Sequence, residues 1–295
     1  MKISSQLLHT SYANHSSTKE PAFIEIWETL EKYQDTYHEV LKRNNLWPDK
    51  YYWPFDALHT NTRVWEYPFV INGINETKGP NSAKKLLDIG SALTFFPQFM
   101  TDCGYEVTCV DIDKQLVEWA NEIIKSSIFN EGASVFKKPI SEFIQEDVSV
   151  LDVPDEYYDV ITNISVLEHI PFTKMPVILK NIHRKLKHDG VFVCTLDAYI
   201  SGDRTSEHMP LTHDELKQFM DMIMEHFELL QPLSLVGVDN LITNSSYPFS
   251  RQKNEKKDDD FVWRTKRALK YFMNEQYFVD RSIQWTALGF ILKKK

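Results

Sequence analysis

Between residues 84 and 197, short apolar runs alternate with segments of helical periodicity, and this alternation limits the possible folds more than any other feature. Strands are predicted at 86–90, 106–111, 133–136, 158–164 and 190–196, and helices at 95–103, 114–126 and 175–186. Continuously apolar strands that alternate with helices indicate a parallel sheet covered on both faces. Because such crossovers are right-handed, we expect an α/β, doubly wound, Rossmann-like fold.

The pattern changes after the fifth strand. Thr212, with Glu215 three residues later, predicts a helix that begins with a capping box. Two further strands are predicted at 227–235 and 285–292, which makes the sheet seven-stranded. The residues between them, about 236–283, are expected to form an insert over the sheet that is charged at 251–260 and helical at 261–273.

The first 80 residues differ from the rest by their many aromatic side chains. A helix is predicted at 21–43, where Phe23, Ile26, Leu30 and Tyr33 recur at spacings of three and four. A turn is expected at 79–82. We therefore expect residues 1–80 to form an N-terminal helical and aromatic extension on the substrate side, and residues 81–295 to form the ligand-binding domain.

Composition and charge exclude several classes of protein. The formal charge of −9 at pH 7 gives no general attraction to phosphate backbones, so nucleic-acid substrates are disfavoured. No stretch approaches the roughly 20 apolar residues that cross a bilayer, and residues 1–9 lack the apolar region of a signal peptide. The three cysteines show no CxxC spacing. These features predict a cytoplasmic protein without a membrane or nucleic-acid partner.

Two residues after neighbouring strands indicate the kind of ligand. In a doubly wound sheet the ligand binds at the carboxyl ends of the strands, where the strand order reverses. Gly90 follows the first strand and permits a tight turn with close backbone approach to a ligand. Asp111 ends the second strand 21 residues later, where a carboxylate can accept hydrogen bonds from both hydroxyls of a ribose. These positions predict a ligand that carries a nucleoside.

The fourth predicted strand, 158–164, is followed by the sequence Ser-Val-Leu-Glu-His-Ile at 165–170. This stretch resembles the class I methyltransferases that depend on S-adenosylmethionine (SAM), specifically the small-molecule group with a Ser-x-Leu-Glu-His-Ile/Val motif after strand four. The resemblance covers residues 84–197 and the two final strands. It implies that SAM is the cofactor and that the last two strands form a late antiparallel pair.

The resemblance also implies roles for particular residues. By position, these are Asp88, Gly90 and Ala92 in the loop at the methionine side of SAM, Asp111 and Ile112 at the ribose and adenine, Asp147 and the backbone of Val148 at the adenine amino group, and Asn163 beside the methionine moiety. One departure is plain. Family members usually carry Gly-x-Gly-x-Gly, whereas Ala92 and Thr94 stand at the second and third glycine positions. We therefore expect SAM to bind less tightly.

Residues 63–69 read Arg-Val-Trp-Glu-Tyr-Pro-Phe and resemble an Arg-x-Trp-Glu-Tyr-Pro element in bacterial methyltransferases of this group. Two roles are open for Arg63. Its guanidinium fork suits the carboxylate of SAM. Alternatively, Arg63 forms a buried structural salt bridge to Glu66 or another acid.

Methyl transfer needs a general base only when the acceptor must lose a proton. His169 is the candidate because it follows the fourth strand and because imidazole titrates near neutral pH. A capping or orienting role is the alternative. Asp197, Asp203, His208 and His213 could in principle collect a metal, but no tight ligand spacing such as HxxxH supports a site, and no metal is expected.

The resemblance implies an enzyme that transfers a methyl group to oxygen or nitrogen of a small organic acceptor. Residues 163–166 lack the Asn/Asp-Pro-Pro-Tyr sequence of amino methyltransferases that act on nucleic-acid bases. Two alternatives stay open. An NAD-dependent oxidoreductase needs glycines at positions 90, 92 and 95, and two of these are missing. The missing glycines also leave open a non-catalytic protein with the methyltransferase fold.

Overall fold

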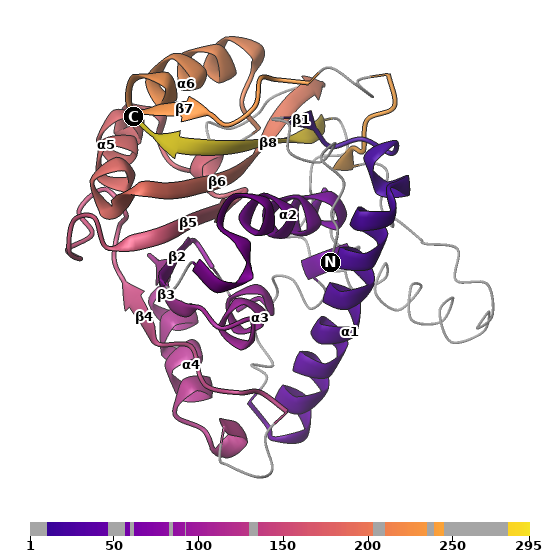
Figure 1. Cartoon of the computed structure of the whole chain (residues 1–295), viewed down its shortest axis with the longest axis vertical. Coiled ribbons are helices and arrows are strands. Elements are labelled where there is room, and N and C mark those ends of the chain that lie inside the picture. Colours follow the sequence, from indigo (N-terminus) through magenta and orange to yellow (C-terminus); the bar gives the residue numbers. More distant parts are fainter. Residues whose placement is uncertain are drawn as a thin grey trace.

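The computed structural model describes most of the chain, whose arrangement is shown in Figure 1. The described residues are 11–46, 57–59, 62–82, 85–91, 93–129, 135–202, 210–234, 239–244 and 283–295. Ala92, Asp203 and His208 lie outside these ranges, as do most of the insert expected at 236–283 and the helix expected at 261–273.

A mixed sheet forms the centre of the described structure (Figure 1). Its strands are β1 (Ser11–Tyr12), β2 (Lys85–Ile89), β3 (Glu106–Asp111), β4 (Glu142–Gln145), β5 (Tyr158–Ile164), β6 (Leu186–Ser201), β7 (Phe227–Leu229) and β8 (Gln284–Lys294). They lie in the order β4-β3-β2-β5-β6-β8, and both β1 and β7 pair with β8. Strands β2 to β6 pair with one another in parallel, whereas β8 is antiparallel to β6 and β7.

This strand order confirms the predicted doubly wound sheet and its late antiparallel pair. Strand β2 lies between β3 and β5, so the chain order reverses at β2. In open α/β sheets such a reversal leaves a crevice at the carboxyl ends of the strands. The candidate ligand residues after β2, β3 and β5 are therefore brought to one edge of the sheet.

Helices cover both faces of the sheet. On one face α5 (Met175–Lys185) and α6 (His213–His226) pack on a core that includes Phe192 and Phe290. On the other face lie α1 (Pro21–Arg43), α2 (Arg63–Ser82), α3 (Phe96–Asp102) and α4 (Lys114–Ile124), over a core that includes Val191 and Val193. Because successive strand residues point to opposite faces, β6 is apolar on both sides.

Two helices match the sequence closely. Helix α1 spans Pro21–Arg43, as predicted, and it buries Phe23, Ile26 and Leu30. At the start of α6 the backbone N–H of Glu215 donates to the Thr212 hydroxyl at 3.3 Å, and the Thr212 N–H donates to the Glu215 carboxylate at 2.9 Å. The predicted capping box is therefore confirmed.

The strand expected at 133–136 is wrong for residues 135 and 136, whereas 133 and 134 lie outside the described residues. Val135 and Phe136 lie in a bend, and the strand beside β3 is β4, Glu142–Gln145. The ring of Phe136 packs against Tyr33 and Tyr37 of α1, with ring centroids 6.1 Å and 5.8 Å apart. The apolar pattern at this place reflects contact with the N-terminal extension, which local sequence does not reveal.

The turn expected at 79–82 is also wrong, because α2 continues to Ser82. Glycine and proline at 79 and 80 oppose a helix. However, Val64, Trp65, Val70 and Ile74 are buried earlier along α2. Packing of these turns overrides the local propensity, as it does for most helices in globular proteins.

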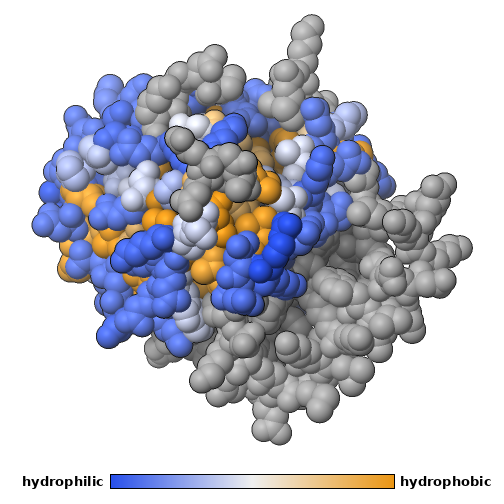
Figure 2. Space-filling view, turned by 90° about the horizontal axis from the view of Figure 1, so that it is seen from below, coloured by the Kyte–Doolittle hydropathy of each residue, from blue (hydrophilic) through white to orange (hydrophobic). Residues whose placement is uncertain are grey.

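Among the described residues, no helix is long and apolar enough to cross a membrane. Figure 2 shows that the described part of one face is mostly hydrophilic, with hydrophobic side chains gathered toward its middle.

Candidate cofactor and acceptor site

A small cavity of about 60 Å³ lies at the carboxyl ends of β2 and β5, beneath the first turns of α2. The sequence-predicted residues that line it are Arg63, Asp88 and Gly90, and the residues after β5 that line it include Ser165 and Val166. The cavity is therefore located where the strand order reverses.

Gly90 brings the backbone close to the cavity. Its φ is +68°, a conformation that residues with a side chain rarely adopt. A Cβ at this position would lie 2.5 Å from both γ-carbons of Val166. The Gly90 N–H donates to the Val110 carbonyl at 2.8 Å, which ties the turn to β3. Only glycine fits this turn, as the sequence predicted.

Asp88 lies at the floor of the cavity and is 3% exposed. Its Oδ1 accepts a hydrogen bond from the Thr162 hydroxyl at 2.6 Å. Burial raises the pKa of Asp88 to about 7, although the Thr162 and Ser91 hydroxyls lower it. The nearby Asp111 carboxylate adds to the rise. Desolvation therefore dominates the electrostatics of this carboxyl.

Arg63 lies in the cavity wall and forms an ion pair with Glu66. The distance from Nη1 to Oε1 is 2.7 Å, and the two side chains are 11% and 0% exposed. The salt bridge considered from the sequence is therefore present. A guanidinium has five N–H donors, so the pair does not exhaust its capacity. The role of Arg63 toward SAM stays a prediction.

Glu66 joins three elements. The hydroxyls of Thr62, Ser165 and Thr195 each donate to its carboxylate at 2.6 Å. Burial alone would raise the pKa of Glu66, but Arg63 and the three hydroxyls hold it below its usual value. Glu66 thus connects α2 with the end of β5 and with β6. The sequence named Glu66 only as a partner for Arg63 and Ser165 only as part of the motif at 165–170, and no local signal identified Thr195.

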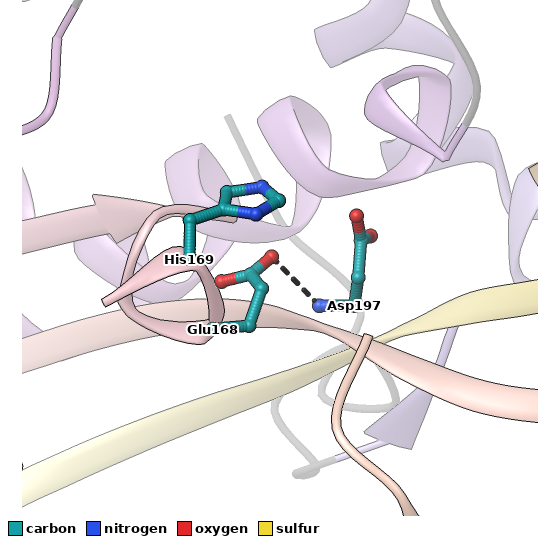
Figure 3. Close-up of side chains that lie close together, drawn as sticks. All are labelled: Glu168, His169 and Asp197. Carbon is teal, nitrogen blue, oxygen red and sulfur yellow. Dashed lines mark hydrogen bonds between the residues drawn. The ribbon is translucent and has the colours of Figure 1, made fainter. Parts of the chain in front are cut away.

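A second cluster of charged groups lies beside the first. It consists of Glu168, His169 and Asp197, each of which offers a ligand atom within 4.8 Å of the others. Figure 3 shows the Glu168 carboxylate below the His169 ring, with the Asp197 carboxylate beside that ring. The Asp197 N–H donates to Glu168 Oε1 at 2.9 Å, whereas Oε2 of the buried Glu168 has no hydrogen-bond partner. The structure therefore brings His169 together with two acids.

The environment of these acids is dry. Burial raises the pKa of Glu168 to about 7. Burial, with the neighbouring Glu168 and Glu66, raises the pKa of Asp197 to about 8. The Ser165 hydroxyl lies 3.5 Å from Asp197 Oδ1, and Ser165 also lines the cavity. The Ser165 side chain thus lies between the cluster and the cavity.

Asp111 and Ile112 lie at the end of β3 and do not line the cavity. Asp111 Oδ1 accepts from the Asp113 N–H at 3.0 Å, and Asp113 caps α4. The Ile112 side chain is 73% exposed. A carboxylate can accept hydrogen bonds from the hydroxyls of a ribose. An exposed apolar side chain next to it can pack against the face of an adenine.

Asp147, Val148 and Asn163 also lie outside the cavity lining. Asp147 Oδ2 pairs with Lys174 Nζ at 2.8 Å, and the hydrogen bonds from Lys174 and Ser149 lower the pKa of Asp147 to about 2. The Val148 carbonyl accepts from Asn181 at 2.8 Å.

Asn163 is fully buried at the end of β5. The Leu167 N–H donates to its Oδ1 at 3.3 Å, and its Nδ2 has no hydrogen-bond partner. The side chain therefore keeps an unused donor one residue before the cavity-lining Ile164 and Ser165.

Comparison with known proteins agrees with this geometry. A family model described as a methyltransferase domain matches residues 67–241, more than half of the chain.

Solved structures similar to the chain include three methyltransferases. A TehB-like SAM-dependent methyltransferase from Corynebacterium glutamicum is 17% identical, with 72% of this chain and 81% of that chain covered and a TM-score of 0.40. Phosphoethanolamine N-methyltransferase 2 of Haemonchus contortus, in complex with SAM, is 15% identical, with 81% and 58% covered and a TM-score of 0.46. An O-methyltransferase of a trans-AT PKS multienzyme of Brevibacillus brevis, in complex with S-adenosylhomocysteine, is 16% identical, with 76% and 71% covered and a TM-score of 0.46.

The fold, the cavity at the strand reversal and the family match define a SAM-binding Rossmann-like domain. The chain belongs to the class I SAM-dependent methyltransferase family, and its cofactor is S-adenosylmethionine. This assignment replaces the NAD-dependent alternative.

Proposed function

We propose that the chain transfers the methyl group of SAM to oxygen or nitrogen of a small organic acceptor. The observation that carries this proposal is the cavity at β2 and β5, which has the glycine turn and Arg63 in its wall and the Glu168–His169–Asp197 cluster next to Ser165. One side of this site suits a nucleoside with an amino-acid group, and the other side is left for an acceptor.

The residues present fit SAM. The Gly90 turn lets the backbone approach the methionine side, where Asp88 lies at the cavity floor and Ala92 is the next expected contact. The Arg63 guanidinium, fixed by Glu66, suits the carboxylate of SAM. SAM supplies a methyl group on a positively charged sulfur.

Further contacts are proposed along the strand ends. Asp111 would accept hydrogen bonds from the ribose hydroxyls, and Ile112 would cover a face of the adenine. Asp147 and the Val148 backbone would hold the adenine amino group, which requires Asp147 to share its carboxylate with Lys174. Asn163 would use its unpartnered Nδ2 near the methionine moiety.

On the acceptor side, His169 is our candidate catalytic residue. It is exposed, whereas Glu168 is buried directly beside it. Residues 1–80 are proposed to form the extension that covers this side, and residues 81–295 the SAM-binding domain with its insert at 236–283. Arg63 and Tyr67 of α2 both line the cavity, so the extension would contribute side chains to the site. We place the protein in the cytoplasm, with no nucleic-acid or membrane partner.

The test is methyl transfer from SAM carrying a labelled methyl group. The full chain is incubated with a cell extract separated into small molecules, RNA and protein. We expect label in the small-molecule fraction and none in the other two. Label in RNA or protein alone would overturn the proposed acceptor class. SAM binding without transfer to any fraction would support the alternative, a non-catalytic protein of this fold.

A further inference from the structure

We propose that Glu168, His169 and Asp197 form a binding site for a divalent cation of the Mn²⁺ or Mg²⁺ type. The sequence pointed to Asp197 only in combination with residues that follow it, because spacing along the chain does not show that ligands from two separate elements meet. Glu168 and His169 belong to the 3-10 turn Leu167–His169 after β5, and Asp197 lies on β6. The parallel pairing of β5 with β6 brings them together.

The geometry of the cluster suits a cation. The three ligand atoms lie within 4.8 Å of one another. Metal–oxygen bonds of about 2.1 Å place ligands around a cation roughly 3–4.2 Å apart. The three side chains therefore need only a small movement to close on an ion. In Figure 3 the imidazole ring and the two carboxylates lie around one space.

The hydrogen bonds of Glu168 leave a place for a ligand. This side chain is 2% exposed, and its Oε2 has no hydrogen-bond partner. A buried carboxylate oxygen without a partner carries a large desolvation cost. A cation between Glu168, His169 and Asp197 would supply the missing interaction.

The charges nearby compensate the two acids only in part, because the Arg63 guanidinium attracts Glu168 and Asp197 at a distance but forms its ion pair with another acid. Glu66 is paired with Arg63 at 2.7 Å. In the part of the chain that the structure describes, no lysine or arginine forms an ion pair with Glu168 or Asp197. Two carboxylates thus face one imidazole, and this donor set, rich in oxygen and free of sulfur, favours Mn²⁺ or Mg²⁺.

The position of the site suggests that the cation acts on the methyl acceptor. This role rests on the proposed function. Ser165 separates the cluster from the cavity, so the cation would lie at the acceptor side. A divalent cation makes a bound hydroxyl more acidic. The acceptor class that this site suits is therefore a hydroxyl compound. His169 would serve as a ligand, in place of the general base expected from the sequence.

The proposal is tested by titrating Mn²⁺ into the metal-stripped full chain and counting free Mn²⁺ by electron paramagnetic resonance. We expect one saturable site per chain, at least tenfold weaker in Glu168→Gln, His169→Gln and Asp197→Asn. Glu118→Gln, which changes an exposed acid of α4, is the matched control and should bind as the wild type does. Absence of saturable binding, or binding that these three variants leave unchanged, would overturn the site.

SAM binding measured on the same samples separates this proposal from the proposed function. Variants that bind SAM like the wild type but have lost Mn²⁺ are folded, and their loss supports the cation site. Wild-type chain that binds SAM and transfers its methyl group while ignoring Mn²⁺ overturns the cation site and leaves the methyltransferase intact.

Discussion

Arg63 Nη1 lies 2.7 Å from Glu66 Oε1, and Glu66 has no exposed surface. The guanidinium lines the cavity, whereas its partner is held by hydroxyls of α2, β6 and the residue after β5. The pair therefore fixes a cationic group in the cavity wall and joins the N-terminal extension to the sheet.

Arg63→Lys is expected to weaken SAM binding. Lysine keeps the positive charge but loses the planar fork that can meet Glu66 and a ligand carboxylate together. A hydrogen bond to a charged group is worth about 1.5–3 kcal/mol, which corresponds to a 10- to 100-fold loss of affinity in calorimetry. Arg184→Lys changes an exposed arginine and should bind normally. Equal affinity in the two variants would remove Arg63 from the SAM site.

Glu66→Ala is expected to lower the free energy of unfolding of the whole chain. It leaves a buried guanidinium without its partner, which costs about 3–5 kcal/mol in the free energy of unfolding. Glu39→Ala removes an exposed acid that pairs with Arg43 and should change stability by less than about 0.5 kcal/mol. Urea unfolding measures both, and a small effect of Glu66→Ala would contradict the role of this network.

Gly90→Ala and Gly104→Ala separate backbone strain from steric overlap. Both glycines have positive φ, +68° and +107°, but a Cβ at Gly104 meets nothing within 4 Å. We expect Gly104→Ala to cost about 1–2 kcal/mol of unfolding free energy, and Gly90→Ala to cost about 1–3 kcal/mol more, because its Cβ overlaps Val166. Adding Val166→Ala should recover part of that excess. No recovery would argue against this packing of the turn.

The raised pKa of Asp88 predicts that the free energy of unfolding depends on pH. Its pKa is about 7 in the folded chain and 3.8 in the absence of the fold. The folded state therefore holds the proton more tightly, and the stability that this carboxyl contributes is present below pH 3.8 and is lost as the pH rises toward 7. Asp88→Asn removes the effect.

Urea unfolding at pH 5 and pH 8 checks this expectation. The free energy of unfolding of Asp88→Asn, relative to that of the wild type, should rise between the two values, by at most about 1.4 kcal/mol per pH unit. Parallel pH profiles would show that burial does not perturb this carboxyl as described.

Much of the fold followed from the sequence because strand and helix periodicities are local properties. Strand β5 and helix α1 have their predicted bounds, and Thr212 caps its helix as expected. Errors arose where distant contacts decide the outcome. Phe136 looked like part of a strand, yet it packs on α1, and the turn at 79–82 is overridden by the burial of α2.

The site was only partly accessible to the same reasoning. Gly90 and Asp111 stand out because of their place after a strand. Ser165 also follows a strand, but its contact with Glu66, like that of Thr195, could not be predicted, since it exists only after β5 and β6 pair beneath α2. Asp197 was considered for a metal with Asp203, His208 and His213, and its closeness to Glu168 and His169 was not foreseen, because spacing along the chain does not show which side chains meet.

We propose that SAM lies across the ends of β2 and β3, with its ribose at Asp111. Calorimetric titration of SAM into the wild type, Asp111→Asn and the control Asp152→Asn tests it most directly. Loss of a charged acceptor for the ribose hydroxyls predicts a 10- to 100-fold weaker affinity for Asp111→Asn, from about 1.5–3 kcal/mol, and no change for the control. An affinity of Asp111→Asn within about twofold of the wild type, on the scale where 1.4 kcal/mol is tenfold, would contradict the account.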